Sequence, residues 1–198
     1  MTKIKRWTDS NRLKINDTKT EFIQFGNKRQ WQCCTDSIDV NDAVVEKSSE
    51  IKYLGVWFDN TVSFKSHVSK KCRLAMLNLQ RLQLIRSCLT VDACKTLVQG
   101  LVISHLDYAN AVFAELPECE LKMLQRVQNI AAKLIPRKKK YDSASACRKE
   151  LHWLPLTARI DFKIILLVFK CLTNKAPAYL QSLISWKTTN RFETMQGY

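Results

Sequence analysis

The stretch from Ile51 to Asp59 most constrains the fold of this chain, because the pattern of apolar residues differs on its two sides. Its bulky residues, including Tyr53, Val56 and Trp57, fit a pleated surface and predict a β-strand. Gly55 interrupts the run and indicates a bulge or a close approach of another backbone, although an ordinary core strand with a bulge explains the same residues. The sequence predicts a small sheet up to this stretch and basic helices after it.

Short strands are predicted in the N-terminal part. We expect a first strand at Glu21 to Gly26, a weak strand pair within Ser37 to Val45, and Ile51 to Asp59 as the last strand. The short connections favour antiparallel pairing. The expected fold class is therefore α+β, mostly α, with a small antiparallel β-sheet followed by a basic helical bundle.

Helical periodicity begins at Ser63. Apolar residues from Phe64 to Leu89 recur at spacings of three, four or seven, which predicts a long helix with Ser63 as its N-cap. Thr90 is a suitable N-cap for a second helix, which we expect to run on to Phe113.

Three further helical segments follow. Pro117 suits a helix start, and an apolar stripe continues from Leu121 to Leu134. Ser143 to Leu151 predicts a short helix, and we interpret the His-Trp-Leu-Pro step from His152 to Pro155 as a packing corner. Thr157 to Leu172 is apolar nearly all round and predicts the buried central helix of the bundle.

Positive charge is concentrated in the helical part. Residues 1–60 contain 10 Lys and Arg against 9 Asp and Glu, whereas residues 61–198 contain 22 against 9, and the whole chain carries a net charge of +14. A field of one sign favours a polyanionic partner, with nucleic acid ahead of an anionic membrane surface. A basic surface without a partner is the alternative.

Composition argues against several other classes. The 8 cysteines are scattered and form no Cys-x-x-Cys pair, so we expect no metal site. The longest apolar run, Ile164 to Phe169, is too short to span a bilayer, and the charged start lacks the apolar core of a signal peptide. We therefore expect an intracellular protein, nuclear or cytoplasmic. No Ser-His-Asp or Cys-His arrangement and no glycine-rich phosphate loop is recognisable, and Tyr108 and Asn110 are interpreted as packing or capping residues.

A series of motifs, in order along the chain, resembles the C-terminal part of the reverse transcriptases of non-LTR (LINE-type) retrotransposons, closest to the jockey and chicken-repeat branch. The motifs are Trp7 with Asn11 to Asn16 and Lys19 to Phe22, Tyr53 to Val56 with Asp59, Leu106 to Tyr108 with Asn110, Leu124 to Asn129, Leu151 to Pro155 with Arg159, and Ala176 to Leu180. The resemblance implies the end of a polymerase palm with its primer-grip hairpin at residues 1–60 and a helical thumb at 61–135. A helical extension would follow at 136–186, and residues 187–198 would form a loose tail.

The sequence departs from this family at the catalytic centre. Polymerases of this kind use two metal ions held by aspartates. In the family these aspartates precede the equivalent of Trp7 and include an Ala-Asp-Asp turn, whereas this sequence contains no Asp-Asp pair. The resemblance therefore implies that this chain alone does not polymerise DNA, has no catalytic residue of its own, and holds neither the family's Mg²⁺ nor another cofactor.

The resemblance also assigns roles to palm residues. Lys19 matches a lysine close to the leaving pyrophosphate, a role that is empty without the aspartates and that leaves a sheet-edge lysine as the alternative. Leu54, Gly55 and Val56 match the primer grip, where a glycine permits close approach of the primer strand.

Four basic residues of the first predicted helix would contact the phosphates of the bound duplex. They are Lys65, Lys70, Lys71 and Arg73. Such contacts position a nucleic acid and give salt-dependent affinity that does not depend on base sequence. For each of them, a solvated position on the helix surface is the alternative.

The expected partners are a primer–template duplex or structured RNA, without a membrane partner. Self-association is expected through the apolar face that a missing palm would cover. Two other functions remain open: an independent basic helical module that binds RNA or protein, and a retrotransposon relic without function.

Overall fold

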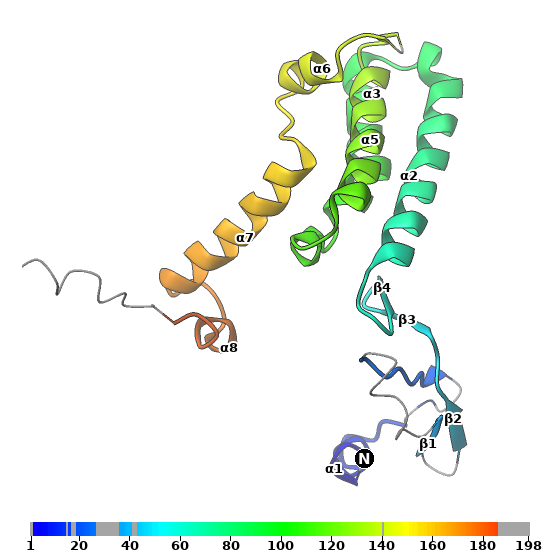
Figure 1. Cartoon of the computed structure of the whole chain (residues 1–198), viewed down its shortest axis with the longest axis vertical. Helices are drawn as coiled ribbons and strands as arrows, with labels where there is room; N and C mark the ends of the chain where they lie inside the picture. The colour runs from blue at the N-terminus through cyan, green and yellow to red at the C-terminus, as the bar shows by residue number, and fades with distance from the viewer. Residues whose placement is uncertain are drawn as a thin grey trace, which may run out of the picture.

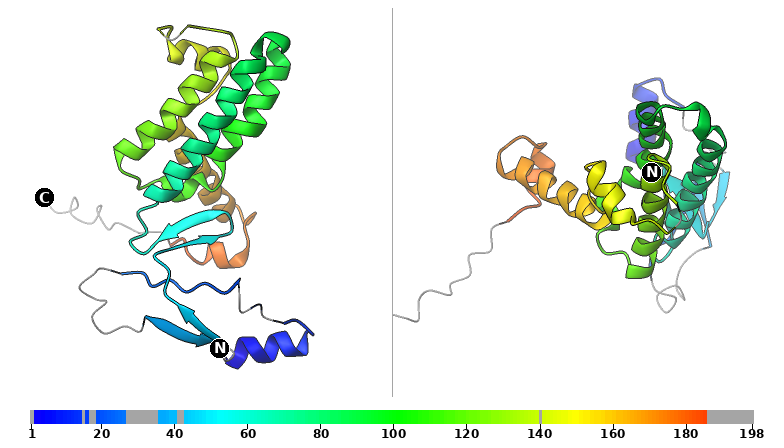
Figure 2. Two further views of the ribbon diagram at one scale, coloured as in Figure 1. Left: turned by 90° about the vertical axis from the view of Figure 1, so that its right-hand side faces the viewer. Right: turned by 90° about the horizontal axis from the view of Figure 1, so that it is seen from above.

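The computed structural model describes residues 2–14, 16, 19–26, 36–40, 43–139 and 141–185. This part is mostly helical, with two small two-stranded antiparallel sheets, so the expected α+β, mostly α class is confirmed (Figure 1). The strands lie at one end of the helical bundle (Figure 2). The tail predicted at residues 187–198 falls outside the described residues.

The N-terminal elements are one helix and four short strands. They are α1 (Thr2–Ser10), β1 (Ser37–Val40), β2 (Ala43–Glu46), β3 (Glu50–Tyr53) and β4 (Val56–Asp59). β1 pairs with β2 and β3 pairs with β4, both antiparallel, and the first of these confirms the strand pair expected within Ser37 to Val45.

The prediction of a single strand from Ile51 to Asp59 is wrong, because the stretch forms the β3–β4 hairpin. Leu54 and Gly55 make its turn, with φ of 47° and 81°. Two-residue hairpin turns require positive φ at these positions, and glycine adopts it without steric cost. Gly55 therefore marks a reversal of the chain and not a bulge.

The strand expected at Glu21 to Gly26 is also wrong. This segment forms one parallel bridge, between Phe22 and Lys47, and the Phe22 carbonyl accepts a 2.7 Å hydrogen bond from the Ser48 N–H. The strands on both sides of residues 47–49 are already paired within their own hairpins. The segment consequently bridges to the link between the two small sheets, and at its end the Gly26 N–H donates to the Asn60 carbonyl at 3.2 Å.

Helices make up the rest of the described chain. They are α2 (Lys65–Ile85), α3 (Val91–Val98), α4 (Ser104–Asp107), α5 (Glu118–Leu134), α6 (Ala144–Glu150), α7 (Leu156–Leu172) and α8 (Ala178–Gln181), with the 3₁₀ helices η3 (Arg86–Cys88) and η5 (Asn110–Phe113) and the π-helical turn η4 (Gln99–Ile103). None of the helices in the described ranges is long and apolar enough to cross a membrane.

The α2 helix starts differently from the expectation. Its N-cap is Phe64, at φ 56°, and not Ser63. The carboxylate of Asp59, at the end of β4, accepts hydrogen bonds from the Phe64 N–H at 3.1 Å and from the Ser63 hydroxyl at 2.8 Å. Burial raises the pKa of Asp59, but hydrogen bonds from Thr61, Ser63 and Phe64 outweigh it and lower the pKa below its usual value.

The second predicted helix is confirmed at its start and wrong at its end. Thr90 caps α3 by accepting a 3.2 Å hydrogen bond from the Ala93 N–H. The helix then widens into η4, where the Asn78 side chain donates to the Leu101 carbonyl at 2.8 Å, and α4 ends at Asp107. A polar side chain inserted beside a helix is a recognised cause of such a distortion.

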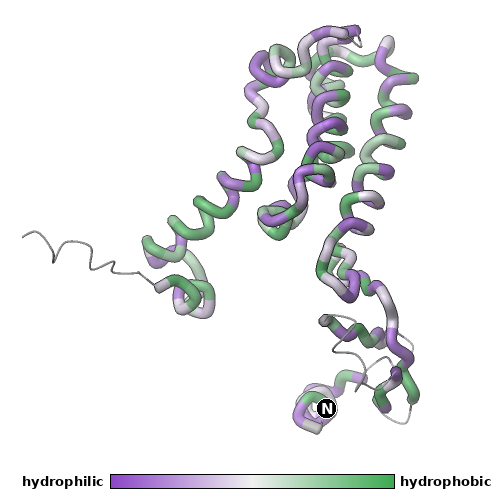
Figure 3. Tube along the Cα trace, in the orientation of Figure 1, coloured by the Kyte–Doolittle hydropathy of each residue, from purple (hydrophilic) through white to green (hydrophobic). Residues whose placement is uncertain are grey.

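The prediction that Thr157 to Leu172 is the buried central helix is wrong. Within α7 only Leu156, Ile160 and Cys171 are buried, and Ile165 is 65% exposed. One side of α7 packs on α5 and η5, and the helix then extends away from the bundle (Figure 1). Several of its apolar residues are therefore exposed, among them Phe162 and Phe169. Figure 3 shows how much of the helix is hydrophobic. The central place belongs to α5, which contacts α2, α6, α7 and η4.

The corner predicted at His152 to Pro155 is confirmed as a packing corner. Trp153 is 8% exposed and belongs to the core. Two amides of α5 hold this corner: Gln128 donates to the Leu154 carbonyl at 2.9 Å, and Gln125 accepts from the Leu156 N–H at 2.8 Å.

Arg86 closes the end of the bundle far from the strands. Its buried guanidinium donates to the carbonyls of Leu134, at 3.0 Å, Leu89, at 2.8 Å, and Ile135. A cation at the C-terminus of α5 also complements the helix dipole. One side chain thereby satisfies the carbonyls of two helix ends.

Replacing Arg86 with Met is expected to lower the free energy of unfolding by about 2–4 kcal/mol, because buried carbonyls lose their donors. The free energy of unfolding of Arg86→Lys should lie between those of Arg86→Met and the wild type, because one ammonium group cannot reach the same three carbonyls. Urea unfolding measures the stability of both variants, with Arg81→Met, at an exposed position of the preceding α2 helix, as the control. Equal effects of Arg86→Met and Arg81→Met would contradict this account.

Candidate nucleic-acid interface

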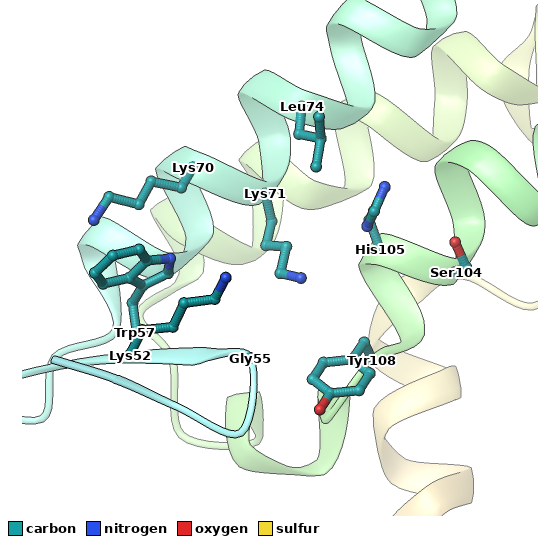
Figure 4. A pocket seen from close by; sticks show the side chains of 9 residues that line it. All are labelled: Lys52, Gly55, Trp57, Lys70, Lys71, Leu74, Ser104, His105 and Tyr108. Carbon is teal, nitrogen blue, oxygen red and sulfur yellow. The ribbon is translucent and has the colours of Figure 1, made fainter. Parts of the chain in front are cut away.

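A pocket of about 380 Å³ lies between the β3–β4 hairpin, α2 and α4 (Figure 4). It is lined by Lys52, Gly55 and Trp57 from the hairpin, Lys70, Lys71 and Leu74 from α2, and Ser104, His105 and Tyr108 from α4 and the residue after it.

Two hydrogen bonds hold the hairpin against the helices. The Trp57 N–H donates to Nδ1 of the buried His67 on α2 at 3.1 Å, and the Tyr108 hydroxyl donates to the Leu54 carbonyl at the turn at 2.5 Å. Gly55 makes the second contact possible, because a Cβ at this position would lie 3.2 Å from the Tyr108 ring. The hairpin thus forms one wall of the pocket.

Lysine ammonium groups lie over both aromatic rings of the pocket. Lys70 Nζ is 3.4 Å from the centroid of Trp57, Lys52 Nζ is 5.8 Å from the same centroid, and Lys71 Nζ is 5.2 Å from that of Tyr108. Such cation–π contacts hold an ammonium group in place. Lys70 is also paired with Glu50 at 2.7 Å.

Unneutralised positive charge converges on this pocket. No ion pair joins Lys52 or Lys71 to a carboxylate within the described ranges. Burial and the charge of Lys52 lower the pKa of Lys71, and burial and the charge of Lys71 lower the pKa of His105. These groups repel one another, so an anion in the pocket would relieve a repulsion that the free protein carries.

Three of the residues singled out from the sequence meet in this pocket: Gly55, Lys70 and Lys71. Two others support its wall, since Leu54 provides the carbonyl that binds Tyr108 and the side chain of Val56 is buried beneath the hairpin.

The other three residues lie elsewhere. Lys65 lines a separate cavity with Phe64 and Pro117, and Arg73 is exposed on α2 outside the pocket lining. Lys19 is exposed in the segment that precedes the Phe22 bridge.

The sequence analysis missed Lys52, Trp57, His105 and Tyr108 as pocket residues. Lys52 and Trp57 are cross-strand partners, so a correctly placed turn at Leu54 and Gly55 would have paired them. No local signal brings His105 and Tyr108 to the hairpin. Tyr108 and Asn110 were interpreted as packing or capping residues. Tyr108 is the C-cap residue of α4, is 47% exposed and also binds the turn, and Asn110 is buried.

A search of the described residues for three or more His, Cys, Asp or Glu side chains that could hold a metal ion finds no such group. Comparison of the chain with protein-family models, curated proteins and solved structures finds no match.

Gly55→Ala is expected to destabilise the hairpin, because alanine is strained at φ 81° and its Cβ would press on Tyr108. The expected loss is about 1–2 kcal/mol in urea unfolding. Gly100→Ala in η4 is the matched control, since no atom lies within 4 Å of the added Cβ, and it should be neutral or slightly stabilising. Equal losses in the two variants would contradict the assigned role of Gly55.

Acid should weaken the fold through His67. Nδ1 accepts from Trp57, so the ring hydrogen is on Nε2, which is buried without a partner in the described structure. Burial, followed by the charges of Lys71 and Lys70, lowers the pKa of His67 from 6.5 to about 4. The unfolded chain therefore binds the proton more readily between these two values, and stability falls as the pH drops from 6.5 towards 4, by roughly 3 kcal/mol in total.

Urea midpoints measured from pH 7.5 to pH 4 test this expectation. His67→Asn keeps an acceptor for the Trp57 N–H but cannot be protonated, so its stability should depend less steeply on pH than that of the wild type. The same slope in both proteins would rule out His67 as the titrating group.

Proposed function

We propose that this protein binds the phosphate backbone of nucleic acid through the pocket between the hairpin, α2 and α4. The observation that carries the proposal is the convergence of Lys52 and Lys71 on a cavity that Lys70 also lines, with no carboxylate paired to either among the described residues. The net charge of +14 adds long-range attraction for a polyanion. Binding of this kind is independent of base sequence and weakens with salt.

We further propose that the chain corresponds to the C-terminal part of a non-LTR retrotransposon reverse transcriptase. Residues 1–60 would be the end of the palm with its primer-grip hairpin, 61–135 the thumb and 136–186 the extension. The proposal is supported by the motif order, by a hairpin whose turn is Leu54 and Gly55, and by the helical bundle that follows it. The ligand would then be a primer–template duplex or structured RNA, met in the nucleus or cytoplasm.

On this proposal the chain alone is inactive as a polymerase. The aspartates that hold Mg²⁺ in the family belong to motifs without a counterpart in this sequence, so DNA synthesis would need them from elsewhere. What the chain itself contributes is the grip on the nucleic acid.

An independent module that binds RNA or protein is the second candidate, and the exposed apolar side of α7 favours it. Phe162, Ile165 and Phe169 are all more than half exposed along one helix. Self-association through the face that a missing palm would cover stays a prediction, and the outward side of α7 offers a further apolar surface for association. A relic without function would show neither salt-sensitive binding nor association.

Binding to a labelled RNA–DNA hybrid across a salt series tests the proposal. Lys52→Gln and Lys71→Gln should each lower the magnitude of the slope of log K against log salt by about 1, because each removes a phosphate contact. The controls are the single variants Lys149→Gln and Lys163→Gln, each of which removes one charge from an exposed site, on α6 and α7 respectively. If the pocket variants and the controls give the same slope, the affinity is a property of the overall charge, and the pocket is not the site.

A further inference from the structure

The pocket contains two aromatic rings, and aromatic rings in nucleic-acid-binding proteins commonly stack on bases. Trp57 and Tyr108 could therefore serve either as stacking platforms for bases or as supports for the lysines. The surroundings of each ring distinguish the two roles.

The Trp57 ring is already in contact with a cation of the protein itself. Lys70 Nζ lies 3.4 Å from the ring centroid and is bound on its other side by the Glu50 carboxylate at 2.7 Å. Ser66 donates to the same carboxylate at 2.5 Å. The hydrogen bonds from Lys70 and Ser66 lower the pKa of Glu50, so the carboxylate stays charged and retains the lysine. A base stacking on this face would have to displace Lys70 from both the ring and the carboxylate.

The Tyr108 ring is held from two directions. Lys71 Nζ lies 5.2 Å from its centroid, and the backbone at Gly55 approaches so closely that a Cβ there would be 3.2 Å from ring atoms. The hydroxyl is bound to the Leu54 carbonyl. In Figure 4 the side chains of Lys52 and Lys71 extend into the space between the two rings.

The pocket is therefore bordered by ammonium groups that are paired with no carboxylate in the part of the chain that the structure describes. Lys52 and Lys71 are close enough for the charge of one to lower the pKa of the other, and His105 adds a third nitrogen base. A phosphate group can accept hydrogen bonds from several such donors at once, whereas an uncharged base offers less to two ammonium groups.

We propose that this pocket takes a phosphate group and no base, and that Trp57 and Tyr108 are positioning residues that act through Lys70 and Lys71. The inference rests on the proposed nucleic-acid binding and names what the site recognises in it. It also fits a duplex ligand, whose bases are paired away from the protein while its phosphates are exposed.

The test compares two single-stranded DNA oligonucleotides of equal length, one with bases and one with abasic sugars throughout. Single strands are used because their bases are unpaired and free to stack on aromatic side chains. Affinities are measured by fluorescence anisotropy at low salt for the wild type and for the Lys52→Gln, Lys71→Gln double variant, each shown to be folded by circular dichroism. For each oligonucleotide, the affinity of the wild type is divided by that of the double variant. This ratio isolates the contribution of the pocket from that of the remaining basic surface.

The expected result is the same ratio for both oligonucleotides, within about threefold. A base stacked on either ring would add roughly 5- to 150-fold to the affinity for the base-containing strand. A loss of that size for this strand alone, on Trp57→Leu or Tyr108→Leu, would overturn the inference while leaving nucleic-acid binding intact. A ratio of one for both strands would also overturn it. If the RNA–DNA hybrid were equally indifferent to the double variant, the proposed function would fall as well.

Aromatic variants test the positioning role. Tyr108→Leu removes the ring beneath Lys71 and should weaken both oligonucleotides equally, with Tyr108→Phe, which keeps the ring, closer to the wild type. A loss confined to the base-containing strand would overturn the inference, and Trp57→Leu provides the same comparison at Lys70.

Competition with inorganic phosphate shows whether the pocket binds a free phosphate ion or a phosphate of the nucleic-acid backbone. If phosphate displaces more of the abasic strand than chloride does at the same ionic strength, the pocket accepts the free ion. Equal displacement assigns the group to the backbone.

Discussion

The hydrogen bond from the Trp57 N–H to His67 Nδ1 joins the two parts of this molecule, and the pocket depends on it. A two-stranded hairpin has little stability of its own, so the position of β3–β4 comes from its contacts with the helices. The bond requires a neutral imidazole, and its Nε2 hydrogen is left buried without a partner in the described structure. The buried Nε2–H of His67 is thus an energetic cost of the bond that fixes the hairpin beside Lys70 and Lys71.

Local chemistry explains which parts of the fold were predictable. The cap at Thr90 and the strand pair of β1 and β2 depend on neighbours only a few residues away, and both were predicted correctly. From their strand propensity alone these residues were taken as one strand, because they fit a strand equally well, and the positive φ of Leu54 and Gly55 shows the reversal. The exposure of α7 could not be predicted. A helix that is apolar on all sides gives no indication of which sides will be covered by other elements.

The same limit applies to the candidate site. Sequence analysis could place several lysines on one helix, but Lys65 and Lys70 lie at different angles around its axis, and only the latter faces the hairpin. Tyr108 is 54 residues from Leu54 along the chain, and its hydroxyl bond to that turn depends on the path of the chain through α3, η4 and α4. Periodicity predicts which residues a helix buries, whereas the convergence of distant segments on one pocket follows from the packing of the whole bundle.

The pocket and the outward side of α7 respond to salt in opposite directions. Screening weakens the attraction between lysines and phosphates, while salting-out ions such as sulfate strengthen contacts between apolar surfaces. Phe162, Ile165 and Phe169 are exposed on α7, a helix that contributes no residue to the lining of the pocket. Removing bound nucleic acid with concentrated sulfate during purification would thus promote aggregation through α7. A moderate concentration of chloride would release the nucleic acid with less aggregation.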